Sequence, residues 1–103
     1  LQLVRIEFDP IKNLVNQAKH GVSLEAAGRA AWDKAVAFPD LRWDYGEARE
    51  IAFVPIDGVV HAVIFTVRDE HMRIISVRRA NQRERRRYVS QVEQEILGGR
   101  GER

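Results

Sequence analysis

The sequence predicts an α+β fold, in which two N-terminal helices and one C-terminal helix pack on one mainly antiparallel sheet. Three observations predict it. The N-terminal third carries apolar residues at helical spacing between helix-capping residues. The middle of the chain holds apolar runs on either side of Asp57-Gly58, a pair that favours a tight hairpin turn. Asn81 and Glu84 form a capping-box pattern that opens a last helix.

The chain opens with an expected strand and helix. Alternating apolar and polar residues predict a strand from Leu3 or Val4 to Phe8. Asp9 is a good N-cap, Pro10 suits the first helical position, and Gly21 suits the left-handed residue that follows a helix. Within this helix, a one-face apolar stripe is formed by Ile11, Leu14, Val15 and Ala18. Ser23 then caps a second predicted helix, which runs to about Asp33.

The rest of the chain is predicted to form the sheet and the last helix. "AVAFPDLRWDY" contains Pro39, which places this short strand at a sheet edge, and residues 40–47 are expected to form a mobile loop. Three further strands follow as "REIAFVPI", "VVHAVIFTVR" and "RIISVRR". The last helix is expected to end at about Leu97. One domain over residues 1–97, with a flexible tail at 98–103, therefore suits a chain of 103 residues.

Positive charge is concentrated in one segment. Residues 1–67 carry 7 basic and 9 acidic residues, a balance of −2, whereas residues 68–88 carry 8 basic and 3 acidic residues, a balance of +5. All eight of these basic residues are arginine, whose guanidinium suits bidentate contacts with phosphate. The concentration predicts a polyanionic partner, with a solvated basic surface as the alternative.

Several classes of protein are excluded by composition. The chain has no cysteine, so disulfides and thiolate metal sites are excluded. His20, His61 and His71 do not have the spacing of metal ligands, and no metal or cofactor is expected. No apolar run approaches the roughly 20 residues of a membrane span, and no signal peptide opens the sequence. A cytoplasmic protein without membrane contact is expected.

Three blocks of sequence resemble the BrnT family of toxins from bacterial type II toxin–antitoxin modules. They are "IEFDPIKNLVNQAKHGVSLEAA", "GEAREIAFVPIDGVVHAVIFTVR" and "RIISVRRANQRERRRY", which together span most of the chain. The sequence departs from the family pattern at Phe8, where the family has tryptophan, and at His61, where it has an aliphatic residue. An aromatic residue of the second block is also replaced, in "REI".

The resemblance implies a RelE-like fold and a metal-independent endoribonuclease of the mRNA interferase type, which inhibits translation. It also implies two partners. One is RNA, either free or bound to the ribosome, and the other is a cognate BrnA-like antitoxin that forms a DNA-binding dimer and masks the basic groove.

Metal-free RNA cleavage sets the chemistry that the candidates must perform. The ribose 2′-hydroxyl loses a proton, the leaving 5′-oxygen gains one, and cationic donors stabilise the charge of the transition state. Arg78 and Arg79 end a predicted strand beside the last helix, where such donors would be useful. Because neighbouring strand residues face opposite sides of a sheet, we expect one to lie in the site and the other to join sheet and helix.

Two further positions are candidates for the chemistry. Lys19 and His20 lie in the last turn of the first helix, where they either complement the helix dipole or transfer protons. Arg68 ends a strand and either reaches the substrate or is solvated. The predicted catalytic residues are Lys19, His20, Arg68, Arg78 and Arg79.

The remaining arginines are assigned to RNA binding rather than to chemistry. Phosphate contacts from arginine add salt-sensitive affinity, although a solvated helix face would have the same composition. The predicted RNA-binding residues are Arg73, Arg83, Arg86 and Arg87. Glu47 and Glu50 are either bases or ion-pair partners, and Trp43 either stacks on a base or covers the sheet. The alternative function is a non-catalytic module that binds nucleic acid or only an interaction partner.

Overall fold

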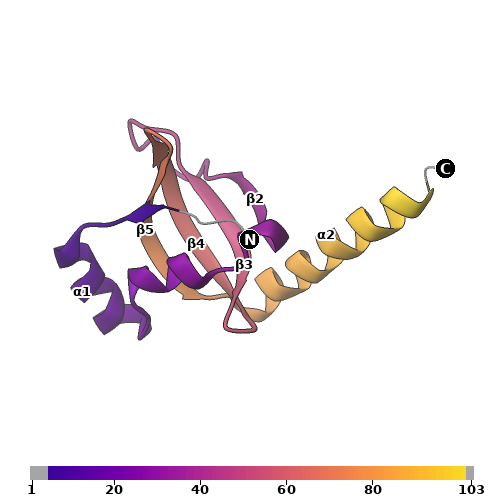
Figure 1. Cartoon of the computed structure of the whole chain (residues 1–103), viewed down its shortest axis with the longest axis horizontal. Helices are drawn as coiled ribbons and strands as arrows, with labels where there is room; N and C mark the ends of the chain where they lie inside the picture. The colour runs from indigo at the N-terminus through magenta and orange to yellow at the C-terminus, as the bar shows by residue number, and fades with distance from the viewer. Residues whose placement is uncertain (1–4, 102–103) are drawn as a thin grey trace.

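The computed structural model describes residues 5–101 and shows an α+β fold built on one five-stranded sheet (Figure 1). The strand order is β1-β5-β4-β3-β2, in which β1 runs parallel to β5 and all other neighbours are antiparallel. The mainly antiparallel sheet is therefore confirmed. Its strands are β1 (Ile6–Glu7), β2 (Val36–Pro39), β3 (Glu50–Ile56), β4 (Val59–Arg68) and β5 (His71–Arg79).

The N-terminal strand follows the prediction only in part, whereas the caps of the first helix follow it fully. β1 has two residues and is shorter than predicted, and Leu3 and Val4 lie outside the described residues. α1 (Pro10–His20) begins where Asp9 Oδ1 accepts a hydrogen bond from the Ile11 N–H at 2.8 Å. It ends at Gly21, whose φ of +72° is the left-handed conformation that glycine adopts easily. Both caps are confirmed.

The apolar stripe of α1 does not face the core. Ile11, Leu14 and Val15 are 72%, 67% and 60% exposed. The face that packs on the protein is the polar one, and its buried residue is Asn16. The usual expectation for an amphipathic helix, that its apolar stripe meets the core, is therefore wrong here.

Asn16 compensates for this arrangement with hydrogen bonds to the backbone of the sheet edge. Its side-chain N–H groups donate to the Val77 carbonyl at 2.8 Å and to the Val22 carbonyl at 2.9 Å. Its side-chain oxygen accepts from the Val77 N–H at 3.3 Å. The amide thus pairs with both polar backbone groups of Val77, as a neighbouring strand would. This contact joins α1 to β5.

The second N-terminal helix is not an α-helix. Ser23 caps it as predicted, but the segment forms the 3-10 helices η1 (Leu24–Arg29) and η2 (Trp32–Lys34). A contact with the sheet lies where this segment leaves helical geometry. The N–H of Ala31 donates to the Pro55 carbonyl at 2.9 Å, and Ala30 forms a bridge with Ile56. These contacts go with an extended conformation at Ala30, so that η1 ends at Arg29 and no continuous helix reaches Asp33.

The core lies between η1 and one face of the sheet. Leu24, Ala26 and Ala27 are the buried residues of η1, and they meet the inward side chains of β3, β4 and β5. Trp32 packs against this core, donates from Nε1 to the Ala27 carbonyl at 2.9 Å, and contacts Phe65 edge to face, with ring centroids 5.6 Å apart. The largest fully buried side chains are Leu24, Ile56, Ile74, Val54, Val63 and Val77.

Turns and edges of the sheet follow the prediction. Asp57 and Gly58 join β3 to β4 with φ values of +50° and +79°, the signature of a type I′ hairpin turn. Asp69 and Glu70 join β4 to β5, also with positive φ values of 48° and 67°. β2, which ends at Pro39, is the outer strand of the sheet.

The C-terminal helix packs on the sheet only at its start. α2 (Gln82–Gly101) opens with the predicted capping box, in which Asn81 Oδ1 accepts from the Glu84 N–H at 2.8 Å and Glu84 Oε1 accepts from the Asn81 N–H at 2.9 Å. The Tyr88 hydroxyl donates to the Lys34 carbonyl at 2.8 Å. Beyond this point α2 projects away from the body (Figure 1). It continues past Leu97 into the predicted tail, of which Glu102 and Arg103 lie outside the described residues.

Candidate functional site

The two arginines at the end of β5 point to opposite faces of the sheet. Arg78 pairs in register with Ala62 of β4, and Arg79 pairs with His61. Arg78 binds Glu84 of α2 through two hydrogen bonds, at 2.7 and 2.8 Å. Arg79 lies on the other face, where it lines a separate cavity. The predicted divergence is confirmed, and Arg78 is the residue that joins the sheet to the last helix.

Arg78 borders a pocket of about 350 Å³ between β2, β5 and the start of α2. Phe38 and Phe53 form an aromatic wall, with ring centroids 5.2 Å apart. The guanidinium of Arg87 lies 4.2 Å from the centroid of the Phe38 ring, a cation–π contact. Arg42, Arg78, Arg83 and Arg87 all line the pocket. The pocket therefore combines apolar ring faces with cations.

His20 lies at the edge of the sheet, at the end of α1. With His61 and Arg79 it lines a cavity of about 430 Å³. Partial burial and the nearby charges of Lys19 and Arg78 hold the pKa of His20 below its usual value of 6.5. The imidazole is therefore neutral at pH 7. His20 and Arg79 therefore line one cavity, whereas Arg78, at the same end of β5, lines the pocket beside α2.

Asn16 provides the structural reason for this proximity. It binds the backbone of Val77, the residue before Arg78. His20 follows Asn16 by about one helical turn. The hydrogen bonds between Asn16 and Val77 therefore place the last turn of α1, with Lys19 and His20, beside the end of β5.

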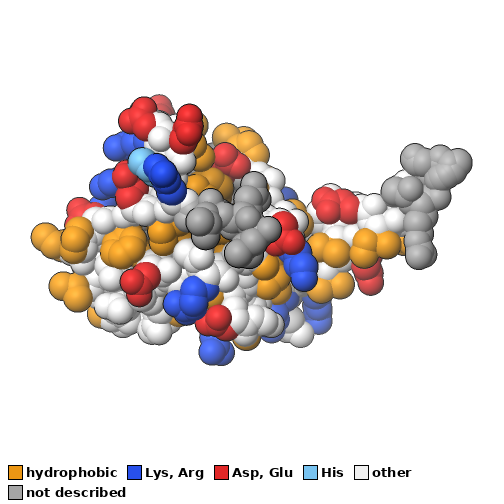
Figure 2. Space-filling view, in the orientation of Figure 1, with side chains coloured by type: hydrophobic (Ala, Val, Ile, Leu, Met, Phe, Trp, Pro, Cys, Tyr) orange, Lys and Arg blue, Asp and Glu red, His pale blue; other side chains and the backbone are white. Residues whose placement is uncertain are grey.

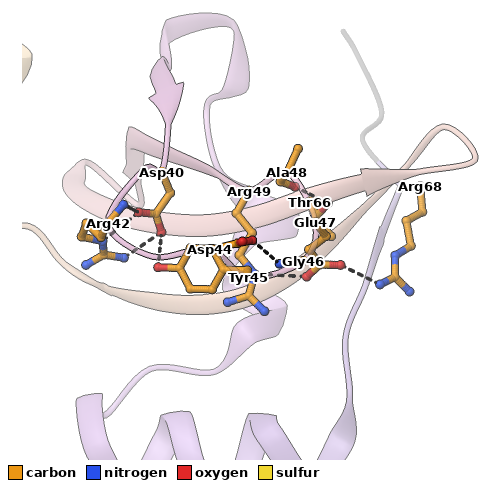
Figure 3. Close-up of polar contacts among 10 residues, drawn as sticks. All are labelled: Asp40, Arg42, Asp44, Tyr45, Gly46, Glu47, Ala48, Arg49, Thr66 and Arg68. Carbon is orange, nitrogen blue, oxygen red and sulfur yellow. Dashed lines mark hydrogen bonds and ion pairs between the residues drawn. The ribbon is translucent and has the colours of Figure 1, made fainter.

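The segment between β2 and β3, predicted to be a mobile loop, is held by a polar network (Figure 3). Asp40 is buried and accepts two hydrogen bonds from the Arg42 guanidinium, at 2.8 and 2.9 Å. The Tyr45 hydroxyl donates to the same carboxylate at 3.0 Å. The Asp40 N–H also donates to the Arg49 carbonyl at 2.8 Å. The Asp40 carboxylate thus holds Arg42 and Tyr45, and its backbone N–H joins the two ends of the loop.

The network continues along the loop to the far end of β4 (Figure 3). The Arg49 guanidinium lies 4.1 Å from the centroid of the Tyr45 ring. Glu47 accepts hydrogen bonds from Arg49 at 3.1 Å and from Arg68 at 2.9 Å. The hydrogen bond from Arg68, and after it the one from Arg49, holds the pKa of Glu47 below its usual value. Glu47 is therefore an ion-pair partner, and its lowered pKa makes it a weaker proton acceptor.

We expect Asp40→Asn to destabilise the protein in a pH-dependent way. Hydrogen bonds from Arg42, and also from Tyr45, hold the pKa of Asp40 at about 2, below its usual 3.8. Because the pKa is lowered by folding, its stabilisation is present above about pH 4 and is lost as the pH falls towards 2. At pH 7 the substitution should cost about 1–2 kcal/mol. Urea denaturation at several pH values should show the gap between wild type and variant closing below pH 4, and a gap that stays constant would contradict this origin.

Arg68 and Arg73 lie at the opposite end of β5 from Arg78. Arg68 pairs in register with His71, and eight residue steps, roughly 27 Å of strand, separate His71 from Arg79. Arg73 binds Glu7 at 3.2 Å. The structure therefore brings His20, Arg78 and Arg79 to one end of β5, and Lys19 precedes His20 in the sequence. Arg68 and Arg73 lie at the other end of β5.

The remaining candidates from the sequence are either packed inside the protein or exposed on its surface. His61 is buried, and its Nδ1 lies 2.7 Å from the Val59 carbonyl, in agreement with a packed rather than a free side chain. Trp43 is 74% exposed, so it does not cover the sheet. Arg83, Arg86 and Arg87 are exposed along the first turns of α2.

Sequence reasoning missed several residues of this region. Asn16 stood out only as a polar residue opposite an apolar stripe, and that pattern does not reveal a backbone partner on β5. Asp40 follows Pro39 at a strand end and resembles an ordinary turn residue. Phe38 and Arg87 are far apart in sequence, so their contact could not be predicted from local pattern. The alternation of Asp40, Asp44 and Glu47 with Arg42 and Arg49 was the one available signal for the loop network.

The fold and this region define a small α+β protein with a basic surface, suited to bind a polyanion. A family model for BrnT, the ribonuclease toxin of type II toxin–antitoxin systems, matches residues 8–84 of the chain. The chain therefore belongs to the BrnT family of ribonuclease toxins, and a cognate antitoxin is its partner. No curated protein matches the sequence. Among residues 5–101, no helix has both the length and the apolar character that a membrane crossing requires.

Proposed function

We propose that this chain is a metal-independent endoribonuclease of the mRNA interferase type, with a RelE-like fold, that acts in the cytoplasm. The observation that supports the proposal is the position of His20, which lines a cavity with Arg79 at the end of β5 that also carries Arg78, because Asn16 binds α1 to Val77. A neutral histidine and an ion-paired arginine at one sheet edge supply a proton acceptor and a fixed cation. Attack by a ribose 2′-hydroxyl needs both.

In this proposal His20 removes the proton from the 2′-hydroxyl, because its lowered pKa keeps the imidazole neutral at pH 7. Arg78 is given both roles that were expected to fall to different arginines: it joins the sheet to α2 and, with its guanidinium held by Glu84, stabilises the negative charge that develops on the phosphate. Arg79, which lines the cavity of His20, serves as a further phosphate contact, and Lys19, next to His20 in the sequence, serves as the acid for the leaving oxygen or as another phosphate contact. Cleavage leaves a 2′,3′-cyclic phosphate and a 5′-hydroxyl.

The RNA strand is proposed to follow a line of arginines along the loop between β2 and β3. The contacts of Asp40, Tyr45 and Glu47 link Arg42, Arg49 and Arg68 in that order (Figure 3). Arg42 also lines the pocket that Arg78 borders. Arg68 would then contact RNA some distance from the scissile bond. Further phosphate contacts are assigned to Arg73, Arg83, Arg86 and Arg87.

We further propose that the antitoxin is BrnA-like and forms a DNA-binding dimer, and that the RNA is cleaved either free or on the ribosome. Both follow from the family rather than from the geometry described above.

The proposal is tested by the ends of the RNA products. Purified protein is incubated with RNA in the presence of EDTA, with and without ribosomes, and the new ends are mapped. We expect 5′-hydroxyl and 2′,3′-cyclic phosphate ends, and no cleavage where a 2′-deoxynucleotide replaces the nucleotide before the cut. Cleavage that needs a divalent metal, or that leaves 5′-phosphate ends, would overturn the mechanism.

A non-catalytic module that binds nucleic acid is the second candidate. It is favoured by one observation, that Arg68, Arg73 and Arg78 are each ion-paired with a carboxylate. This function predicts RNA binding that weakens steeply with salt while the RNA stays intact in both incubations. That result, with correctly folded protein, would replace the enzyme by the binding module.

A further inference from the structure

The apolar stripe of α1 is turned away from the protein that it belongs to. Ile11, Leu14 and Val15 lie on one face and are each at least 60% exposed, whereas Asn16 on the opposite face is buried. Figure 2 shows hydrophobic side chains gathered at the end of the molecule that α1 forms in Figure 1. Burial of this stripe would be favourable, and the fold instead holds it outward through hydrogen bonds of Asn16. Such a surface is suited to a partner.

The charge of α1 specifies the chemistry of that partner. Pro10–His20 contains Lys12, Lys19 and His20 and no acidic residue. Lys12 and Lys19 lie about two turns apart, along one side of the apolar stripe. A complementary surface would therefore have an apolar stripe bordered by carboxylates. A second copy of α1 would place lysines against lysines and is disfavoured.

We propose that Ile11, Leu14, Val15 and Lys12 of α1 form the docking surface for the cognate antitoxin, which would cover them with an acidic amphipathic segment. The partner rests on the family of the chain, and the choice of surface rests on the reversed orientation of α1. This surface adjoins Lys19 and His20. An antitoxin segment that continues past the C-terminal end of α1 would reach the edge of β5 and block access of RNA to His20 and Arg78.

The proposal is tested with Leu14→Glu and with a matched control, Leu97→Glu, on α2. The two leucines are 67% and 64% exposed, so neither substitution should disturb packing. The affinity of each variant for the purified full-length antitoxin of the same module is measured by calorimetry or surface plasmon resonance. Leu14→Glu should weaken binding by about 30-fold or more, because it removes an apolar anchor and adds a charge that repels an acidic partner. Leu97→Glu should change it by less than about threefold.

Lys12→Glu tests the charge part of the proposal separately. It should weaken antitoxin binding, and the loss should shrink as salt concentration rises. Cleavage of RNA by the free Leu14→Glu and Lys12→Glu variants should equal that of wild type. Because binding is read without RNA, the docking proposal can fail while the enzyme proposal stands, and the reverse.

Three outcomes would overturn the docking proposal. The first is wild-type antitoxin affinity for Leu14→Glu. The second is a loss of affinity in Leu97→Glu that equals or exceeds that of Leu14→Glu, which would move the docking surface to α2. The third is a dimer of the toxin alone, seen by sedimentation, that Leu14→Glu converts to a monomer, which would make a second copy the occupant.

Discussion

Arg78→Ala is expected to lower the rate of RNA cleavage by about 100- to 1,000-fold, the usual effect of removing one preorganised donor to a charged transition state. Arg78 is held by two hydrogen bonds to Glu84, and it follows Val77, the residue to which Asn16 anchors α1 and thereby His20. Affinity for RNA should fall by less than about tenfold, since one phosphate contact is lost among several. Single-turnover cleavage and equilibrium binding, measured on the same RNA, separate the two effects.

Two further variants show whether the loss is specific. Arg5→Ala removes an exposed arginine whose backbone binds Met72, at the far end of β5 from Arg78, and cleavage should stay within about twofold of wild type. Arg78→Lys keeps the charge but cannot form the two-pronged contact with Glu84, so it should restore little activity. If Arg78→Ala cleaves RNA at the wild-type rate while remaining folded, Arg78 is a structural link to α2 and has no part in the chemistry.

Asn16→Ala is expected to lower the free energy of unfolding by about 2–4 kcal/mol, because it leaves both backbone groups of Val77 without their partner. In a domain of this size the melting temperature should fall by roughly 10–20 °C. Cleavage should also fall, since α1 would no longer hold His20 beside Arg78. Thermal and urea denaturation measure the first effect, and cleavage at a temperature where the variant is folded measures the second.

The neighbouring substitution Gln17→Ala serves as the control. Gln17 is exposed on α1, and its replacement should change stability by less than about 0.5 kcal/mol. Equal stability of Asn16→Ala and Gln17→Ala would mean that α1 is attached to β5 by something other than the Asn16 amide.

Much of the fold was predictable because its signals are local. The caps at Asp9 and Gly21, the turn at Asp57-Gly58 and the capping box of α2 each depend on a few adjacent residues. The prediction failed where a distant segment competes with local preference. Ser23 starts a helix as expected, but the chain leaves helical geometry at Ala30, next to the hydrogen bond from Ala31 to Pro55 of β3.

The candidate site was predictable as a set of residue types and much less as a geometry. The alternation of side chains along a strand correctly separated Arg78 from Arg79. The residue pattern did not indicate that Arg78 would bind Glu84. It also did not indicate that Arg68 would lie at the start of β5, roughly 27 Å along the strand from Arg79. The register of β4 against β5 decides where Arg68 lies, and register depends on the whole sheet, whereas the turn between β5 and α2 decides the contact of Arg78 with Glu84.

By itself, the sequence determined the α+β class, the main elements, the family and the arginine-rich segment, since these follow from local pattern and composition. Only the tertiary structure decided which way α1 faces. An apolar stripe at helical spacing indicates an amphipathic helix but does not say what the stripe will contact. Here the hydrogen bonds of Asn16 to β5 turn the polar face inward and leave Ile11, Leu14 and Val15 outside. The same contact brings Lys19 and His20 to the end of β5, because an α-helix is rigid and these residues follow Asn16 by about one turn.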